Sequence, residues 1–157
     1  MMKKTAPLLV VLFSLAILTG CAGEKPAPAG TATEIANKIF AEAGVESFGP
    51  HQGLEDDETK EFYLGSRDYP AFADAVAVIP MISLDTRVLV IIRAADKGSV
   101  EEITDGLAQN IDPNRLVCVT FTPEDVVIES RGDVIFLGIN SDSEQRKALV
   151  EAFKSVQ

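Results

Sequence analysis

Three segments of the chain repeat apolar residues at the spacing of an amphipathic helix. Each opens with Ser or Thr followed three residues later by Glu, the capping-box pattern that satisfies free N–H groups at a helix start. Gly44 is a natural end for the first helix. The pattern predicts a helix after each of the boxes that open at Thr31, Ser99 and Ser141, and a shorter acidic helix over 56–63.

The segments between these helices are apolar and rich in Val and Ile, which favours strands. Five strands are expected, the first two and the last two as hairpins, over 75–82, 87–93, 116–121, 126–130 and 134–139. Pro80 cannot donate to a sheet ladder, so the first strand is expected at an edge or with a bulge there. Hairpins with interspersed helices indicate an α+β fold, an antiparallel sheet of about four to five strands with helices packed on it.

One of these strands is apolar at every position, from Val88 to Ile92. A strand of this kind is buried on both sides. Either helices cover both faces of the sheet, or one face meets a partner.

The first twenty residues have the pattern of a secretory signal. Lys3 and Lys4 precede an apolar run of 11 residues that ends at Leu18, shorter than the roughly 20 residues that span a bilayer as a helix. The sequence from Leu18 to Cys21, Leu-Thr-Gly-Cys, resembles the lipobox of bacterial lipoproteins. That resemblance implies cleavage before Cys21, a lipid on its sulfur and a membrane anchor. The alternatives are an ordinary secretory signal or an uncleaved amphiphile.

The chain is therefore expected in three parts. Residues 1–20 form the signal peptide, residues 21–31 the acylated Cys21 with a flexible tether, and residues 32–157 a single α+β domain. The membrane is the expected partner through the lipid, because two acyl chains suffice for stable anchoring. Loss of Lys3 and Lys4 with the signal takes the net charge from −10 to −12.

Composition excludes several classes of function. With 24 Asp and Glu against 14 Lys and Arg, nucleic acid is not expected as a partner, because contacts to phosphate need clustered basic residues. A single His cannot build a multi-histidine metal site, and no glycine loop that cradles phosphate is present. We predict no cofactor, no metal and no catalytic residues. Cys118 lies among apolar strand residues and is expected in the core.

Four residues are candidates for binding. Tyr63, Arg67 and Tyr69 cluster around Gly65 and could line a groove for a small ligand or peptide, because aromatic residues and Arg are enriched at interface anchors. Ordinary loop polarity is the alternative. His51 lies in a loop rich in Gly and Pro and could act as a general base, but no serine nucleophile stands in a recognisable motif.

Two further motifs have structural explanations. Four consecutive acids, Glu55 to Glu58, suit the start of a short helix better than a calcium site, which spaces its oxygen ligands. Arg131-Gly132-Asp133 spells a tripeptide of cell-adhesion ligands, but Gly and Asp are also what a hairpin turn requires.

Several longer segments together form a pattern of apolar residues and turns that covers most of the mature domain. They are the acidic stretch LEDDETKEFYLG at 54–65, Ala94-Ala95-Asp96 at the opening of a helix, and the final run VVIESRGDVIFLGINSDSEQRKALVEAF. Together they resemble a lipoprotein family catalogued as domain of unknown function 4358, over residues 33–153. That family has no assigned activity, so the resemblance implies location and an intact fold, and no catalytic residues.

The sequence thus predicts a lipid-anchored lipoprotein on the extracytoplasmic face of a bacterial cell membrane. It is expected to work as a non-catalytic binding or accessory module, with an envelope protein or a small ligand as partner. The alternatives are a small envelope hydrolase that uses His51, and an oligomeric structural spacer suggested by the doubly apolar strand.

Overall fold

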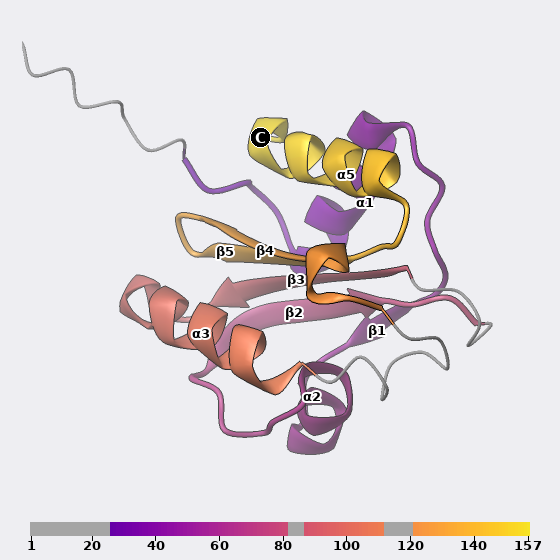
Figure 1. Ribbon diagram of the computed structural model, residues 1–157. Coiled ribbons are helices and arrows are strands. Elements are labelled where there is room, and N and C mark those ends of the chain that lie inside the picture. The colour runs from indigo at the N-terminus through magenta and orange to yellow at the C-terminus, as the bar shows by residue number, and fades with distance from the viewer. Residues whose placement is uncertain (1–25, 82–86, 112–120) are drawn as a thin grey trace, which may run out of the picture.

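A computed structural model of the chain describes residues 26–81, 87–111 and 121–157. Within these residues, five strands form one antiparallel sheet in the order β1-β2-β3-β5-β4. The sheet carries α1 and α5 on one face and α2 and α3 on the other (Figure 1). The predicted α+β fold is confirmed. The bounds are α1 Ala32–Ala43, β1 His51–Gly53, α2 Asp57–Leu64, β2 Phe72–Val78, β3 Val88–Ala94, α3 Val100–Asn110, β4 Val126–Arg131, β5 Val134–Ile139 and α5 Ser143–Ser155.

The central strand β3 is buried on both faces, because its alternate residues enter two separate hydrophobic cores. Leu89 and Ile91 pack in the core under α1 and α5, whereas Val90 and Ile92 pack in the core under α3. All four side chains are fully buried. Of the two explanations for the doubly apolar strand, coverage by the chain's own helices is the one found.

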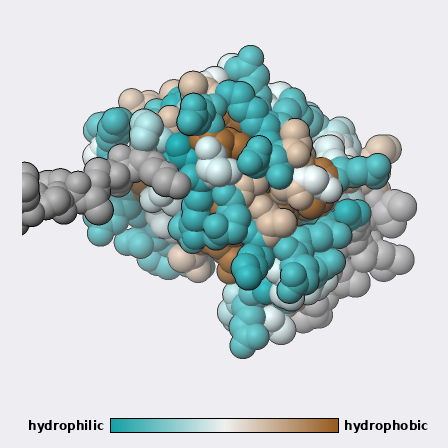
Figure 2. All heavy atoms as spheres, turned by 90° about the horizontal axis from the view of Figure 1, so that it is seen from above, coloured by the Kyte–Doolittle hydropathy of each residue, from teal (hydrophilic) through white to brown (hydrophobic). Residues whose placement is uncertain are grey.

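The two long helices on the first face turn their polar sides outward. Seen from the α5 side, the surface is mainly hydrophilic, with hydrophobic residues in small patches between polar ones (Figure 2). Inside, the ring of Phe153 in α5 stacks on Phe136 of β5 with centroids 5.3 Å apart. This face of the sheet is therefore covered by an amphipathic pair of helices.

The predicted capping box at Thr31 is confirmed. The Thr31 hydroxyl accepts from the N–H of Glu34, whose carboxylate accepts from the N–H of Thr31. A second carboxylate, from Asp74 of β2, accepts from the N–H of Ala32. The start of α1 is thus tied to the sheet as well as to itself.

The boxes predicted at Ser99 and Ser141 are wrong. Asp142 caps α5 instead, and its carboxylate accepts from the N–H groups of Glu144 and Gln145 in the first turn of the helix. The Ser99 hydroxyl donates to the carbonyl of Asp96, and a short 3-10 turn over 97–99 precedes α3. Asp96 caps that turn by accepting from the N–H of Gly98, and Ser99, the N-cap residue of α3, makes no side-chain hydrogen bond to the helix.

The strands differ from the prediction in three places. β2 lies between β1 and β3 and ends at Val78, before Pro80, so the expected edge position is wrong and the ladder does not include the proline. Its irregularity is at the other end, between Phe72 and Asp74. The residues around His51, expected as a loop, form the short edge strand β1. The strand predicted over 116–121 lies outside the described residues except for Phe121.

The second face of the sheet depends on a close contact between the ends of α2 and α3. α2 ends at Gly65, which has a left-handed backbone with φ +80°. A Cβ atom there would lie 1.8 Å from the carbonyl oxygen of Asn110. Gly44 ends α1 with φ +64°, but nothing lies within 4 Å of its Cβ position. Gly65 is therefore required for space as well as for conformation.

We expect Gly65→Ala to reduce the free energy of unfolding by about 1–3 kcal/mol more than Gly44→Ala. The left-handed backbone costs a side chain about 1–2 kcal/mol at either position. At Gly65 the clash with Asn110 adds about 1–3 kcal/mol, the usual cost of overpacking. Urea unfolding followed by circular dichroism measures both losses. Equal losses would contradict the close contact between α2 and α3.

Candidate functional site

Tyr69 joins α2 to α3. Its hydroxyl donates to the carbonyl of Leu64 at 2.8 Å, and its ring lies so close to Gly106 that a Cβ there would be 2.8 Å from Cε1. Burial raises the pKa of the phenol, and a hydrogen bond with Asn110 opposes that rise. Most of the tyrosine is thus engaged in packing.

The other three candidates do not join Tyr69 in one groove. Tyr63 packs against the core under α3, and its ring meets that of Phe62 edge-on at 4.9 Å. Arg67 is exposed and pairs with Glu61, whose hydrogen bond and charge raise the pKa of the guanidinium. His51 is exposed on β1. The polar cavity that Tyr69 borders is formed with α3 and includes none of these three.

Residues 26–30, which we call the strap, lie against the end of the sheet. Arg131 of β4 is only 8% exposed and donates to the carbonyl of Pro26 from Nε at 3.0 Å and from Nη2 at 2.6 Å. Its Nη1 donates to the carbonyls of Phe153 and Val156 at 2.7 and 2.8 Å. The guanidinium therefore joins the strap, β4 and the C-terminal end of α5, where the helix dipole favours a cation.

A second arginine holds the rest of the strap. Arg93 of β3 donates to the carbonyls of Pro28 and Gly30, both at 2.8 Å, and pairs with Asp133 at 2.7 Å. Burial raises the pKa of Asp133, but hydrogen bonds from Arg93 and from the backbone, with the charge of Arg93, bring it below its ordinary value. The tether expected over residues 21–31 is thus attached to the domain over residues 26–30.

The adhesion-like tripeptide belongs to this attachment. Arg131 is buried, and Asp133 is paired with Arg93. Gly132, between them, has φ +61°, and a Cβ there would lie 2.8 Å from the Cβ of Ala27 in the strap. The hairpin turn is the structural explanation that the sequence offers, and the contacts of the tripeptide with the strap are an addition that the sequence does not predict.

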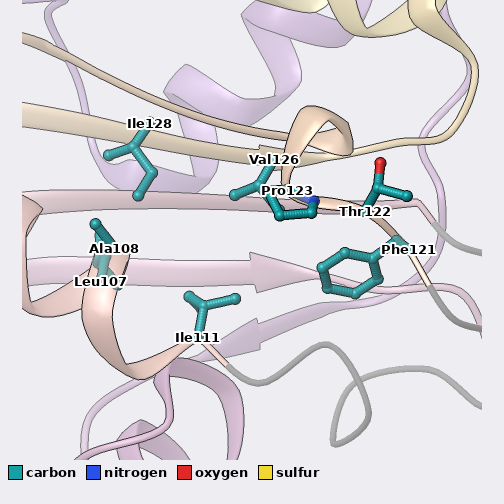
Figure 3. A pocket seen from close by; sticks show the side chains of 8 residues that line it. All are labelled: Leu107, Ala108, Ile111, Phe121, Thr122, Pro123, Val126 and Ile128. Carbon is teal, nitrogen blue, oxygen red and sulfur yellow. The ribbon is translucent and has the colours of Figure 1, made fainter.

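An apolar groove that the sequence did not reveal opens between α3 and β4. It encloses about 410 Å³. Figure 3 shows residues of α3 on one side, Val126 and Ile128 of β4 on the other, and Phe121 with Pro123 at one end. The lining residues are Leu107, Ala108, Ile111, Phe121, Thr122, Pro123, Val126 and Ile128. Alternate β-branched residues on β4 are the only sequence signal, and they do not show where α3 lies.

The crevice between α3 and β4 has a second, polar cavity nearer the strap, of about 560 Å³. There Glu101, Thr104 and Asp105 of α3 face Ser130 of β4 and Gly132 of the turn. We call the two cavities together the α3–β4 groove. Its end near the start of β4 can bury apolar groups, and its end near the turn carries two exposed carboxylates that attract cations.

We expect Arg131→Ala to lower the free energy of unfolding by about 2–4 kcal/mol, because it leaves buried carbonyls at the end of α5 without a donor. Arg67→Ala is the matched control. It removes only an exposed ion pair and should cost less than about 1 kcal/mol. Urea unfolding measures both, and similar values for the two variants would exclude a structural role for the Arg131 contacts.

In the described part of the chain, no three His, Cys, Asp or Glu residues are placed to hold a metal ion. The helices of that part are also too short or too polar to cross a membrane. The chain matches no family model, no curated protein and no solved structure. The resemblance to the lipoprotein family stays a prediction, and what this domain does has to be argued from the groove and the strap.

Proposed function

We propose that the protein is a binding module of the bacterial cell envelope, anchored to the extracytoplasmic face of the membrane by a lipid on Cys21. The observation that carries the binding role is the apolar half of the α3–β4 groove. Its volume of about 410 Å³ is in the range of ligand sites, which combine apolar walls with a few polar groups. Each Å² of apolar surface removed from water there contributes about 25 cal/mol.

The strap supports the anchored arrangement. The chain meets the domain at Pro26, beside the turn between β4 and β5. The five residue-to-residue steps from Cys21 to Pro26 span at most about 18 Å. The apolar half of the groove is built around Val126, at the other end of β4, roughly 17 Å from the turn at the usual rise per residue. An anchored domain would thus present this half away from the bilayer.

The two alternatives receive less support. A hydrolase would need a group that orients the His51 imidazole and a nucleophile next to it. Among the described residues, this exposed side chain has no hydrogen-bond partner. The oligomeric spacer was suggested by β3, and the helices of the same chain cover both faces of that strand. The α3–β4 groove supports neither of these alternatives.

We expect Cys21→Ala to release the protein from membranes and to abolish incorporation of labelled palmitate, because no acyl chain can then be attached. Cys118→Ala is the matched control and should stay in the membrane fraction with its label. Fractionation and labelling of cells that express each variant make the comparison. A Cys21→Ala protein that remains labelled and membrane-bound would exclude the lipid anchor.

We expect the domain, and not the tether, to retain a partner. After mild crosslinking, the full chain should enrich at least one envelope component from solubilised membranes. A lipidated chain that ends at residue 31 is the control and should not enrich it. Quantitative mass spectrometry compares the two, and an identical set of captured components would refute the binding role.

A further inference from the structure

We propose that the α3–β4 groove binds an extended peptide segment of a partner protein, apolar in one half and bearing Lys or Arg in the other, which adds as a strand to the outer edge of β4. This inference rests on the proposed binding function and names the class of its partner. Three features of the groove carry it: the backbone of β4, the apolar half and the acidic half.

The backbone of β4 offers hydrogen bonds at the groove. Among the described residues, β4 is one of the two edge strands of the sheet, opposite β1. The N–H of Asn140 donates to the carbonyl of Asp125, and hydrogen-bonded pairs alternate along an antiparallel ladder. Val127 and Glu129 are therefore the next residues bonded to β5. Ile128 and Ser130 point their N–H and C=O groups away from β5, which is the arrangement that accepts an added strand.

Side chains of the same residues line the groove. Ile128 borders the apolar cavity and Ser130 the polar one. A strand added beside them would place alternate side chains under the exposed stripe of α3. There it would meet Ala108 at one end and Asp105 at the other. Backbone pairing would give affinity, and the two cavities would select the side chains.

The charge of the groove specifies the partner. Its polar half contains the carboxylates of Glu101 and Asp105 against the single ammonium of Lys97, on a chain with net charge −10. A basic side chain is attracted there, while an acidic peptide is repelled, so the same groups favour one partner and exclude the other. From Val126 to Ser130 an extended strand advances roughly 13 Å. The basic residues should therefore be separated from the apolar ones by about four positions along the peptide.

The test begins with the full mature chain in phosphatidylcholine nanodiscs and a random dodecapeptide library displayed on phage, with empty nanodiscs as the subtraction control. We expect enriched peptides to place Val, Ile, Leu or Phe about four residues from Lys or Arg, and to lack acidic residues. Raised salt should weaken binding of a synthetic copy. Enrichment of peptides without basic residues, or of none, would overturn the inference.

Matched variants locate the binding site. Ala108→Arg fills the groove with a bulky cation and should weaken binding of the selected peptide at least tenfold. Gln109→Arg adds the same charge at the next residue, outside the groove, and should change affinity by less than twofold. Asp105→Lys should also weaken peptide binding at least tenfold. Glu42→Lys, at an exposed position of α1, should leave peptide binding unchanged. Equal effects within either pair would exclude the groove as the site.

Amide hydrogen exchange distinguishes the occupants of the edge. The N–H groups of Ile128 and Ser130 should exchange rapidly in the free chain and slowly with peptide. Protection in the free, dilute chain would mean that the chain itself covers the edge, and protection that grows with its concentration would mean a second copy. Either result would overturn the proposal that a partner peptide binds this edge.

Capture from membranes distinguishes this inference from the proposed function. A membrane partner that is captured equally by the wild-type chain and by Ala108→Arg would refute the peptide inference and leave the binding function intact.

Discussion

A strand that is apolar on both sides has to be covered on both sides, and the arrangement of this molecule follows from that constraint. β3 lies in the middle of the sheet and sends alternate residues into two cores. On the first face, α1 and α5 pack beside each other and cover the sheet. The second face carries, among the described residues, one long helix, α3, and the shorter α2. The outer part of that face, beside β4, therefore remains a groove. The concavity is thus a product of unequal coverage.

The sequence was informative wherever a pattern depends on neighbours in the chain. The apolar repeats placed three helices, and the Val- and Ile-rich runs placed the central strands, because burial of one face or both imposes those periods. It does not predict the side-chain caps at the starts of α3 and α5, because Asp142 rather than Ser141 caps α5, and Asp96 caps the turn before α3 while Ser99 makes no cap hydrogen bond. A carboxylate accepts a charge-assisted hydrogen bond and also interacts with the helix dipole, so Asp142 takes precedence over Ser141. Pro80 is incompatible with a ladder, but the strand ends before it instead of lying at an edge.

The candidate site could be predicted only in part, because its geometry is tertiary. Tyr69 was identified from its residue type, but the residue that explains it, Gly106, is far away in sequence and makes room for its ring. Arg131 was seen in a tripeptide, while its partners are carbonyls of the strap and of the last helix. A carbonyl has no sequence signature, so contacts of this kind are invisible until the fold is known. The same holds for the α3–β4 groove, whose two walls come from separate elements.

The strap also determines how the domain responds to force. A pull on the N-terminal end of the chain first meets the hydrogen bonds that Arg131 and Arg93 make to its carbonyls. Those two side chains belong to different strands, and Arg131 holds the end of α5 as well. The load is therefore divided between the sheet and the last helix, at one end of the molecule, before it can unwind α1. The apolar half of the α3–β4 groove, at the start of β4, lies away from this end, so its shape can persist while the attachment is under tension.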